Sequence, residues 1–375
     1  MALKSLVKKI PYWMLLYYVL FAVWVGTTAM HIPDGYLSPV TSIVMLVLAL
    51  PFWIRGVQKL REKMSAKNIP IVALIAAFSF VVMMFNVPLP GGTTGHAVGG
   101  ALAAIILGPE IATIAISIAL VIQAFFFGDG GILAIGANCF NMAVVLPYIS
   151  YAIYQAISKN ESLNSKRRIV GAAIGGWTGL TIASFFAAVE FGIQPLLWHA
   201  GDGTPLYAPY PLSVSIPAMV IPHAFIASVV EALVTALVVA YLMRANQPAL
   251  EMVNKAQIAP ETNSFAKWRA LWIGLAVLVV ITPIGLLAPG TAWGEWGAEE
   301  LTSLGLSFIP RGLEKLSGLW SSPMPDYDIP ALGNANVAYI LSAIVGILIT
   351  IGVVWLFSML VTSGKKTSSE ISTSN

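Results

Sequence analysis

Charged residues are scarce in this sequence. Only 10% of its 375 residues are Asp, Glu, Lys or Arg, and 58% are hydrophobic, whereas soluble domains carry about 25% charged residues. The mean hydropathy is +0.82. Because so few polar residues cannot cover such an apolar chain in water, this composition excludes an ordinary soluble domain. It predicts an all-α, polytopic membrane protein built as a helical bundle.

Cysteines and nucleotide-binding motifs are almost absent. The single cysteine, Cys139, excludes a disulfide framework and any zinc or iron–sulfur site made of cysteines. The glycine-rich run 91–100 lacks the Gly-Lys-Ser/Thr ending of a phosphate-binding loop, and residues 364–366 lack the upstream glycine and the hydroxyl. We therefore expect a chain that is not an enzyme and that cannot use ATP through a site of its own.

Nine apolar stretches are candidates for membrane crossings. They are residues 38–55, 69–87, 97–108, 110–127, 132–157, 169–189, 213–243, 270–288 and 336–362. Residues 97–108 are too few to span ~30 Å comfortably unless the segment is tilted or broken. We count them as a crossing because the chain, passing from one side of the membrane to the other at each crossing, then places every Lys and Arg except Arg311 and Lys315 on the inner side. The net charge of +3 therefore reflects topology in a lipid bilayer, and we expect no nucleic-acid partner.

Residues 1–29 have the features of a signal peptide. Lys4, Lys8 and Lys9 precede an uncharged apolar run, and small residues around Ala29 offer a cleavage site. An uncleaved membrane anchor is the alternative, because the apolar run is slightly long. In either case the chain emerges at His31 on the outer face of the cytoplasmic membrane, so a mature N-terminus would lie outside.

The rest of the chain is expected to divide into three segments. Residues 30–244 form a membrane domain of about seven crossings, and residues 245–269 form a polar cytoplasmic linker. Residues 270–375 form an accessory module, in which two crossings bracket an external loop at 289–335. This loop is rich in Gly, Pro and Trp, and the sequence leaves its role open.

Cleavage after Ala29 would create a terminus that begins Met30-His31. Such a terminus offers a metal the α-amine of Met30, the backbone amide nitrogen of His31 and an imidazole nitrogen of His31. These donors close fused five- and six-membered chelate rings in one plane, and His96 is the candidate for the remaining corner. A planar nitrogen site suits Ni(II), Cu(II) or low-spin Co(II), and suits Mg(II), Ca(II) or tetrahedral Zn(II) badly. The alternative is an ordinary turn, because Pro-Asp-Gly follows directly.

Several polar residues in apolar surroundings are candidates to support this site. They are Gln123, Asp129, Asn138, Asn141, His223 and Glu231. Unpaired polar groups are costly inside a membrane, so we expect these side chains to face the bundle interior. There they could hydrogen-bond the ligand histidines, although hydrogen bonding between helices without a metal role is an equal alternative. We expect Glu110 and Glu190, near crossing ends, to reach water, and His199 to lie at the surface.

The runs at 30–35, 91–109, 123–142 and 223–235 together resemble the CbiM/NikM family. Its members are the membrane substrate-capture components of energy-coupling-factor transporters for cobalt and nickel. The resemblance covers about residues 30–243 and implies a helical bundle with the chain terminus inserted into its outer face. It implies a metal held by Met30, His31 and His96. The implied partners are a transmembrane coupling subunit and two ATPase subunits.

The C-terminal segment resembles the small accessory component of the same transporters, the CbiN/NikN type. The resemblance rests on residues 282–288 and 311–315. Arg311 stands where the accessory motif Pro-Asp-Gly-Leu-Glu has its aspartate, so the match is imperfect. It implies that the accessory unit is fused to the capture component in one chain.

The expected function is therefore uptake of Ni²⁺ or Co²⁺, and a planar nitrogen site favours nickel. Copper would bind more tightly on the Irving–Williams order, so selectivity must come from availability or geometry. One alternative is a proton-coupled secondary permease, which would need no ATPase. Another is a membrane-embedded enzyme that uses Asp129, His223 and Glu231, although no paired nucleophile and base supports it.

Overall fold

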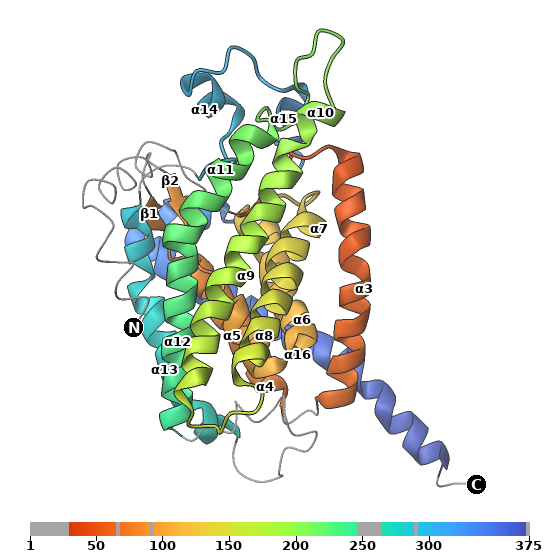
Figure 1. Cartoon of the computed structure of the whole chain (residues 1–375), viewed down its shortest axis with the longest axis vertical. Helices are drawn as coiled ribbons and strands as arrows, with labels where there is room; N and C mark the ends of the chain where they lie inside the picture. Colours follow the sequence, from red (N-terminus) through yellow and green to blue (C-terminus); the bar gives the residue numbers. More distant parts are fainter. Residues whose placement is uncertain (1–29, 65–67, 90–92, 246–263, 289–291, 373–375) are drawn as a thin grey trace, which may run out of the picture.

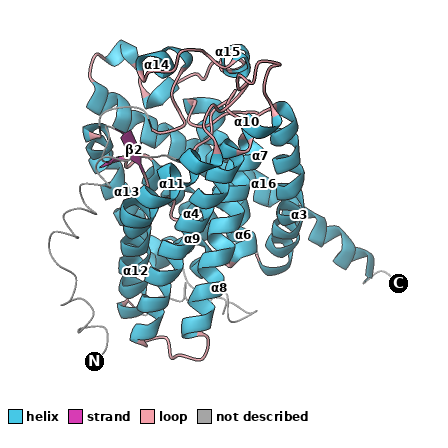
Figure 2. Cartoon of the chain, turned by 45° about the horizontal axis from the view of Figure 1, so that its top comes forward, coloured by secondary structure: helices cyan, strands magenta, loops and turns pink. Residues whose placement is uncertain are grey.

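The computed structural model describes residues 30–64, 68–89, 93–245, 264–288 and 292–372. The predicted signal peptide, residues 1–29, and most of the predicted linker lie outside the described residues. The described chain folds almost entirely into helices, as the sequence predicts, and forms one bundle (Figures 1 and 2). Loops gather at the upper end of the bundle in Figure 1, which we call the loop end.

The helices of the first part are α3 (Pro39–Lys63), α4 (Ile69–Met83), α5 (Gly100–Leu107), α6 (Pro109–Ile122), α7 (Ile135–Asn138), α8 (Leu146–Ser158), α9 (Lys166–Gly192), α10 (Gln194–Leu197), α11 (Leu212–Pro222) and α12 (Ser228–Arg244). Single π-helical turns extend α6 (Gln123–Phe127), join α7 to α8 (Cys139–Val145) and join α11 to α12 (His223–Ala227). Strands β1 (Val87–Leu89) and β2 (Thr93–Gly95) pair antiparallel, with Val87 opposite Gly95.

The second part of the chain begins with α13 (Ser264–Ile281), which a 3₁₀ segment (Thr282–Leu287) extends. The connection at 292–334, which we call the module loop, contains α14 (Ala298–Ser303), α15 (Arg311–Leu316) and the short 3₁₀ turns Pro325–Tyr327 and Pro330–Leu332. The long helix α16 (Ala335–Ser372) follows it. In Figure 1 the loop helices α14 and α15 lie over the loop end of the bundle.

Six of the described helical stretches are long and apolar enough to cross a membrane. They are Pro39–Lys63, Pro109–Phe127, Ile135–Ser158, Lys166–Leu197, Leu212–Arg244 and Ala335–Val361, and Ile69–Met83 and Leu271–Leu287 are shorter apolar helices. These eight stretches coincide with the eight longer crossings that the sequence predicts. The protein is thus a multi-pass α-helical membrane protein.

The ninth predicted crossing, residues 97–108, is broken. Its first residues are not helical, and α5 has eight residues, which give a helix of about 12 Å. All eight residues of α5 are buried, and α5 packs against α6, α8 and α9. Irregular backbone at membrane depth is tolerated where it is enclosed by protein, and here the surrounding helices enclose it.

The second part of the chain packs on the first through α4. Helix α4 has almost no exposed residue, because α13 and α16 cover the side that α5 and α6 leave open. Gly346 of α16 allows this close approach, since a Cβ there would overlap the ring of Phe80 on α4. This packing places the start of α16, and the module loop before it, beside the N-terminal segment.

The N-terminal segment 30–38 is non-helical and lies inside the loop end. Met30, His31 and Ile32 are at most 2% exposed. The Asp34 carboxylate accepts hydrogen bonds from the backbone N–H groups of Ile132 and Leu133, at 3.0 and 2.8 Å. These contacts hold the start of the described chain as a plug in the bundle.

Candidate metal site

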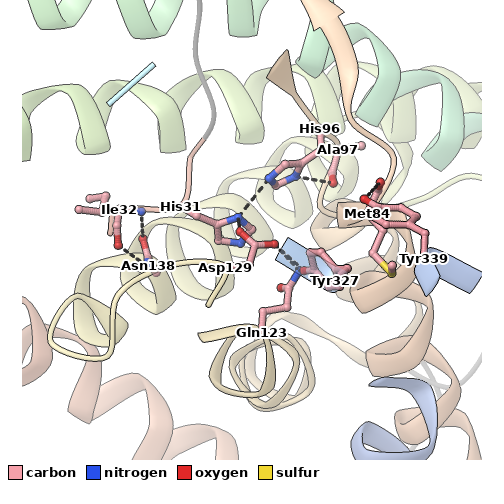
Figure 3. Close-up of polar contacts among 10 residues, drawn as sticks. All are labelled: His31, Ile32, Met84, His96, Ala97, Gln123, Asp129, Asn138, Tyr327 and Tyr339. Atoms are coloured by element: carbon pink, nitrogen blue, oxygen red, sulfur yellow. Dashed lines mark hydrogen bonds and ion pairs between the residues drawn. The ribbon is translucent and has the colours of Figure 1, made fainter. Parts of the chain in front are cut away.

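The two predicted ligand histidines meet at the loop end. His31 belongs to the N-terminal plug, and His96 lies between β2 and α5. Their rings stack with centroids 4.9 Å apart, and His96 Nε2 lies 3.3 Å from His31 Nδ1 (Figure 3). Both side chains are buried, at 2% and 5% exposed. Residues that are 65 positions apart in the sequence thus place two nitrogens within reach of one ion.

A hydrogen bond made by Nδ1 fixes the orientation of the His96 ring. His96 Nδ1 lies 3.0 Å from the carbonyl oxygen of Ala97, so its proton is donated there and Nε2 carries the free lone pair toward His31. Burial, and then the proximity of His31, lowers the pKa of His96 to about 4. The imidazole of His96 therefore stays neutral near physiological pH, as a metal ligand must.

Asp129 completes the group around His31. Its Oδ1 lies 2.7 Å from His31 Nδ1, and its Oδ2 accepts hydrogen bonds from Tyr327 Oη at 2.5 Å and Gln123 Nε2 at 3.2 Å. Burial acts to raise the pKa of Asp129, but the His31 imidazole and the donated hydrogen bonds outweigh it and lower that pKa to about 2. Asp129 is therefore a carboxylate that can balance positive charge at the histidines.

Asn138 fixes the backbone directly after His31. Its Oδ1 accepts from the N–H of Ile32 at 2.8 Å, and its Nδ2 donates to the carbonyl of the same residue at 3.1 Å. Gly130 lies against this pair: its φ is +88°, and a Cβ there would approach Asn138 Nδ2 to 2.9 Å. The loop 128–131 can come this close to the plug because glycine has no side chain.

Glu231 holds the segment that follows His96. Its Oε2 accepts from the N–H groups of Val98 and Gly99, at 2.9 and 2.8 Å, and its Oε1 accepts from that of Ala101 at 3.0 Å. These N–H groups stand at the start of α5, where no helical partner exists. Glu231 is fully buried on α12, so its carboxylate replaces the hydrogen bonds that the broken crossing lacks.

The remaining candidates lie away from the two histidine rings. His223 Nδ1 hydrogen-bonds the carbonyl of Met219 on its own helix, at 2.8 Å. Asn141 donates to Glu190 Oε2 at 3.0 Å, and that bond links the π-turn before α8 to α9. The expectation that Glu190 reaches water is wrong: it is 4% exposed, because the end of α9 is covered by the plug and the module loop. His199 is exposed, as expected.

The module loop contributes two residues that the sequence did not point to. They are Glu295 and Tyr327, which binds Asp129 as described. Both line a cavity of about 390 Å³ together with His31, His96 and Asp129. Tyr327 lies 198 residues after Asp129 in the sequence, and Glu295 is similarly remote, so their proximity to the site could not be recognised from sequence spacing. A possible signal was the concentration of acidic and aromatic residues in the loop.

No ready-made cluster of side-chain ligands lies in the part of the chain that the structure describes. Among these residues no group of three or more His, Cys, Asp or Glu side chains could hold a metal ion. Two imidazoles alone are too few donors for a stable site. A metal bound between His31 and His96 would therefore need donors besides these two imidazoles.

Comparison with known proteins identifies both parts of the chain. Residues 31–249 match the CbiM family model, described as the cobalt uptake substrate-specific transmembrane region, and residues 267–363 match the PDGLE domain. A fused nickel transport protein NikMN of Rhodobacter capsulatus is 50% identical over 85% of this chain and 94% of its own length. A probable fused nickel transport protein LarMN of Lactiplantibacillus plantarum is 41% identical over 85% and 95%.

A solved structure supports the fold of the first part. A crystal structure of a truncated transition metal transporter shares 48% sequence identity with a TM-score of 0.54, covering 57% of this chain and 99% of that one. The family match spans more than half of the sequence, and the accessory domain expected from residues 282–288 and 311–315 is present. The chain belongs to the CbiM family and carries a fused C-terminal PDGLE domain.

Proposed function

We propose that this chain captures Ni²⁺ or Co²⁺ outside the cytoplasmic membrane and is the substrate-binding component of an energy-coupling-factor transporter. The observation that carries the proposal is the convergence of His31 and His96 at the buried start of the described chain. The naming of its fused relatives as nickel transport proteins favours nickel. A transmembrane coupling subunit and two ATPase subunits would supply the energy, because no nucleotide-binding motif is found in this sequence.

Four nitrogens would hold the ion. They are the α-amine of Met30, the amide nitrogen and Nδ1 of His31, and Nε2 of His96. Neighbouring corners of a square plane stand about 2.8 Å apart when metal–nitrogen bonds are about 2.0 Å. His31 Nδ1 and His96 Nε2 lie 3.3 Å apart, so a movement of less than about 1 Å would bring both nitrogens onto one ion.

The charge of the site suits a dication. Loss of the His31 amide proton supplies one negative charge, which would leave a dication with a net charge of about +1. A buried net charge needs a partner, and the Asp129 carboxylate lies 2.7 Å from His31 Nδ1. In the metal-bound state Asp129 would release the Nδ1 position and remain beside the ion as its counter-charge.

The proposal requires cleavage after Ala29, since a peptide bond at Met30 removes the α-amine. The decisive experiment is to measure the mass of the mature chain and its metal content on the same purified sample. A start at Met30 with one nickel per chain is expected. Ala29→Tyr should block cleavage and abolish metal retention, whereas Ala29→Ser keeps a small residue and should behave as wild type. Undiminished nickel in the uncleaved Ala29→Tyr protein would contradict the proposal.

The energy source is a separate question. If the chain acted alone as a proton-coupled permease, cells expressing only this chain would accumulate nickel, and an uncoupler would abolish that uptake. The energy-coupling-factor proposal predicts that accumulation also requires the coupling subunit and a functional ATPase.

A further inference from the structure

We propose that Tyr327 of the PDGLE domain is a positioning residue of the metal site, which holds the Asp129 carboxylate beside His31 as the counter-charge of the bound ion. This inference rests on the proposed function above, because it assigns a role in metal binding. It assigns a specific role to the module loop, whose role the sequence left open.

The contacts of Asp129 are divided between its two oxygens. Oδ1 faces His31 Nδ1 at 2.7 Å, while Oδ2 accepts from Tyr327 Oη at 2.5 Å. Gln123 Nε2 donates to Tyr327 Oη at 2.8 Å as well as to Oδ2. The phenol is therefore held by Gln123 while it holds the carboxylate, and the carboxylate plane is fixed with Oδ1 toward His31 (Figure 3).

The module loop presents Tyr327 in an unusual conformation. Asp326 and Tyr327 have φ values of +54° and +60°, a region that residues other than glycine seldom adopt. Strained backbone persists only where its surroundings enforce it, and such strain gathers at functional sites. Here the enforcement is visible: Ser342 Oγ donates to the Tyr327 carbonyl at 2.7 Å, and the Met324 N–H donates to the Phe126 carbonyl at 3.0 Å.

The ring of Tyr327 is also locked. It stacks on Phe127, with centroids 4.7 Å apart and planes at 19°, and it meets Phe80 and Tyr339 at steeper angles. Phe127 belongs to the turn just before Asp129, so the same element receives the ring and the hydroxyl of Tyr327. Because the ring packs independently of the hydroxyl, Tyr327→Phe removes the hydrogen bond to Asp129 and keeps the packing.

Removing the hydroxyl should loosen the Asp129 carboxylate beside the ion. Without it, Gln123 Nε2 is left as the side chain that donates to Oδ2, at a longer distance of 3.2 Å, and the carboxylate can rotate away from the imidazole. Loss of a supporting residue next to a metal site typically weakens metal affinity by about 10- to 100-fold. We expect Tyr327→Phe to fall near the lower figure, since Gln123 remains.

The test uses the full-length, processed protein in detergent, with nickel as the probe. The nickel dissociation constant and the visible absorption of the bound ion are measured for wild type, Tyr327→Phe, Asp129→Asn and the double variant. Tyr339→Phe is the matched control, because its hydroxyl donates to the Met84 carbonyl at 2.8 Å and makes no hydrogen bond to Asp129. Tyr327→Phe should weaken binding about tenfold and shift the absorption band, while Tyr339→Phe should do neither.

The double variant separates positioning from general damage. If Tyr327 acts through Asp129, adding Tyr327→Phe to Asp129→Asn should weaken binding no further. Wild-type affinity in Tyr327→Phe, or an equal loss in both backgrounds, would overturn the inference while leaving the proposed function intact. A wild-type chain that binds no nickel at all would instead overturn the proposed function, and this inference with it.

Discussion

Polar side chains of the CbiM part and of the PDGLE part have different roles in this chain. In the CbiM part, carboxylates and amides bind backbone: Asp34 holds the loop before α7, Asn138 holds Ile32, and Glu231 holds the start of α5. These bonds stabilise non-helical chain inside the bundle. The module loop of the PDGLE part instead places Tyr327 and Glu295 in the lining of a cavity beside His31, His96 and Asp129 of the other part.

Burial differs between central and outer helices. In the crossing Pro109–Phe127, 72% of the apolar stretch is buried, compared with 28% for Ala335–Val361 of α16 and for Pro39–Lys63 of α3. The CbiM part thus contains its own core, whereas α16 buries one face against α4 and leaves the other to lipid. Under the proposed function the roles are divided: the CbiM part would supply the metal donors, and the PDGLE part would support and cover the site. Variants in the two parts should therefore differ in the size of their effects.

The largest effect is expected for the ligands themselves. His31→Ala removes an imidazole and the chelate ring that it closes, so nickel affinity should fall by at least about 1000-fold, or about 4 kcal/mol. His96→Ala removes one donor of four and should cost less. Equilibrium dialysis with radioactive nickel on the purified protein measures both losses.

His199→Ala is the control for these variants, because His199 is exposed on the loop between α10 and α11. It should bind nickel as wild type does. If His199→Ala lost as much affinity as His31→Ala, the ion would not lie in the plug, and the assignment of His31 and His96 as its donors would be wrong.

Acidification should produce the next largest effect. Binding releases the proton of the His31 amide and any proton on the Met30 amine, whose ordinary pKa is about 8. Nickel affinity should therefore fall by about tenfold or more per pH unit between pH 8 and 5. His96 adds little in this range, because its pKa is lowered to about 4 and its imidazole is already neutral. Isothermal titration at each pH measures the slope, and a flat profile would contradict amide coordination.

Much of the fold follows from the sequence, because apolar length is a local property. Eight crossings can be recognised from their composition, whereas residues 97–108 are counted as a ninth only because of the distribution of basic residues between the two sides. That this segment starts as non-helical chain could not be predicted, since its backbone N–H groups donate to Glu231, 130 residues away from Ala101. A carboxylate on a helix gives no local sign of the backbone that it binds.

The site was predicted in the same uneven way. The convergence of His31 and His96 was expected from the chemistry of a terminal Met-His, and Asp129 was among the candidates. Its partner Tyr327 was not, because the contact depends on how α16 packs on α4 and on the left-handed backbone at Asp326 and Tyr327. Neither feature has a signature in a single sequence.

Glu231→Gln should have an intermediate effect. The new NH₂ group would point at the backbone N–H groups of Ala101 or of Val98 and Gly99, leaving buried donors unsatisfied at a cost of about 1–3 kcal/mol. His96 stands directly before this segment, so nickel affinity should drop about tenfold and the melting temperature should fall. Glu161→Gln, at the opposite end of the bundle beside Arg167, is the control. Nickel affinity unchanged in Glu231→Gln would show that His96 is positioned without this carboxylate.

The smallest effect is expected where the two parts pack together, and two glycines of α16 allow a matched test. A Cβ at Gly346 would overlap the Phe80 ring, which is fully buried and has no room to move, whereas a Cβ at Gly352 would meet nothing within 4 Å. Gly346→Ala should therefore lower the free energy of unfolding by about 1–3 kcal/mol through overpacking and the melting temperature by several degrees. Nickel binding should weaken only a few-fold, because Tyr327 shifts with α16 while the donors stay in place. Gly352→Ala should change neither quantity. Equal behaviour of the two variants in thermal unfolding and nickel binding would mean that α16 does not pack on α4 in the way that brings Tyr327 to Asp129.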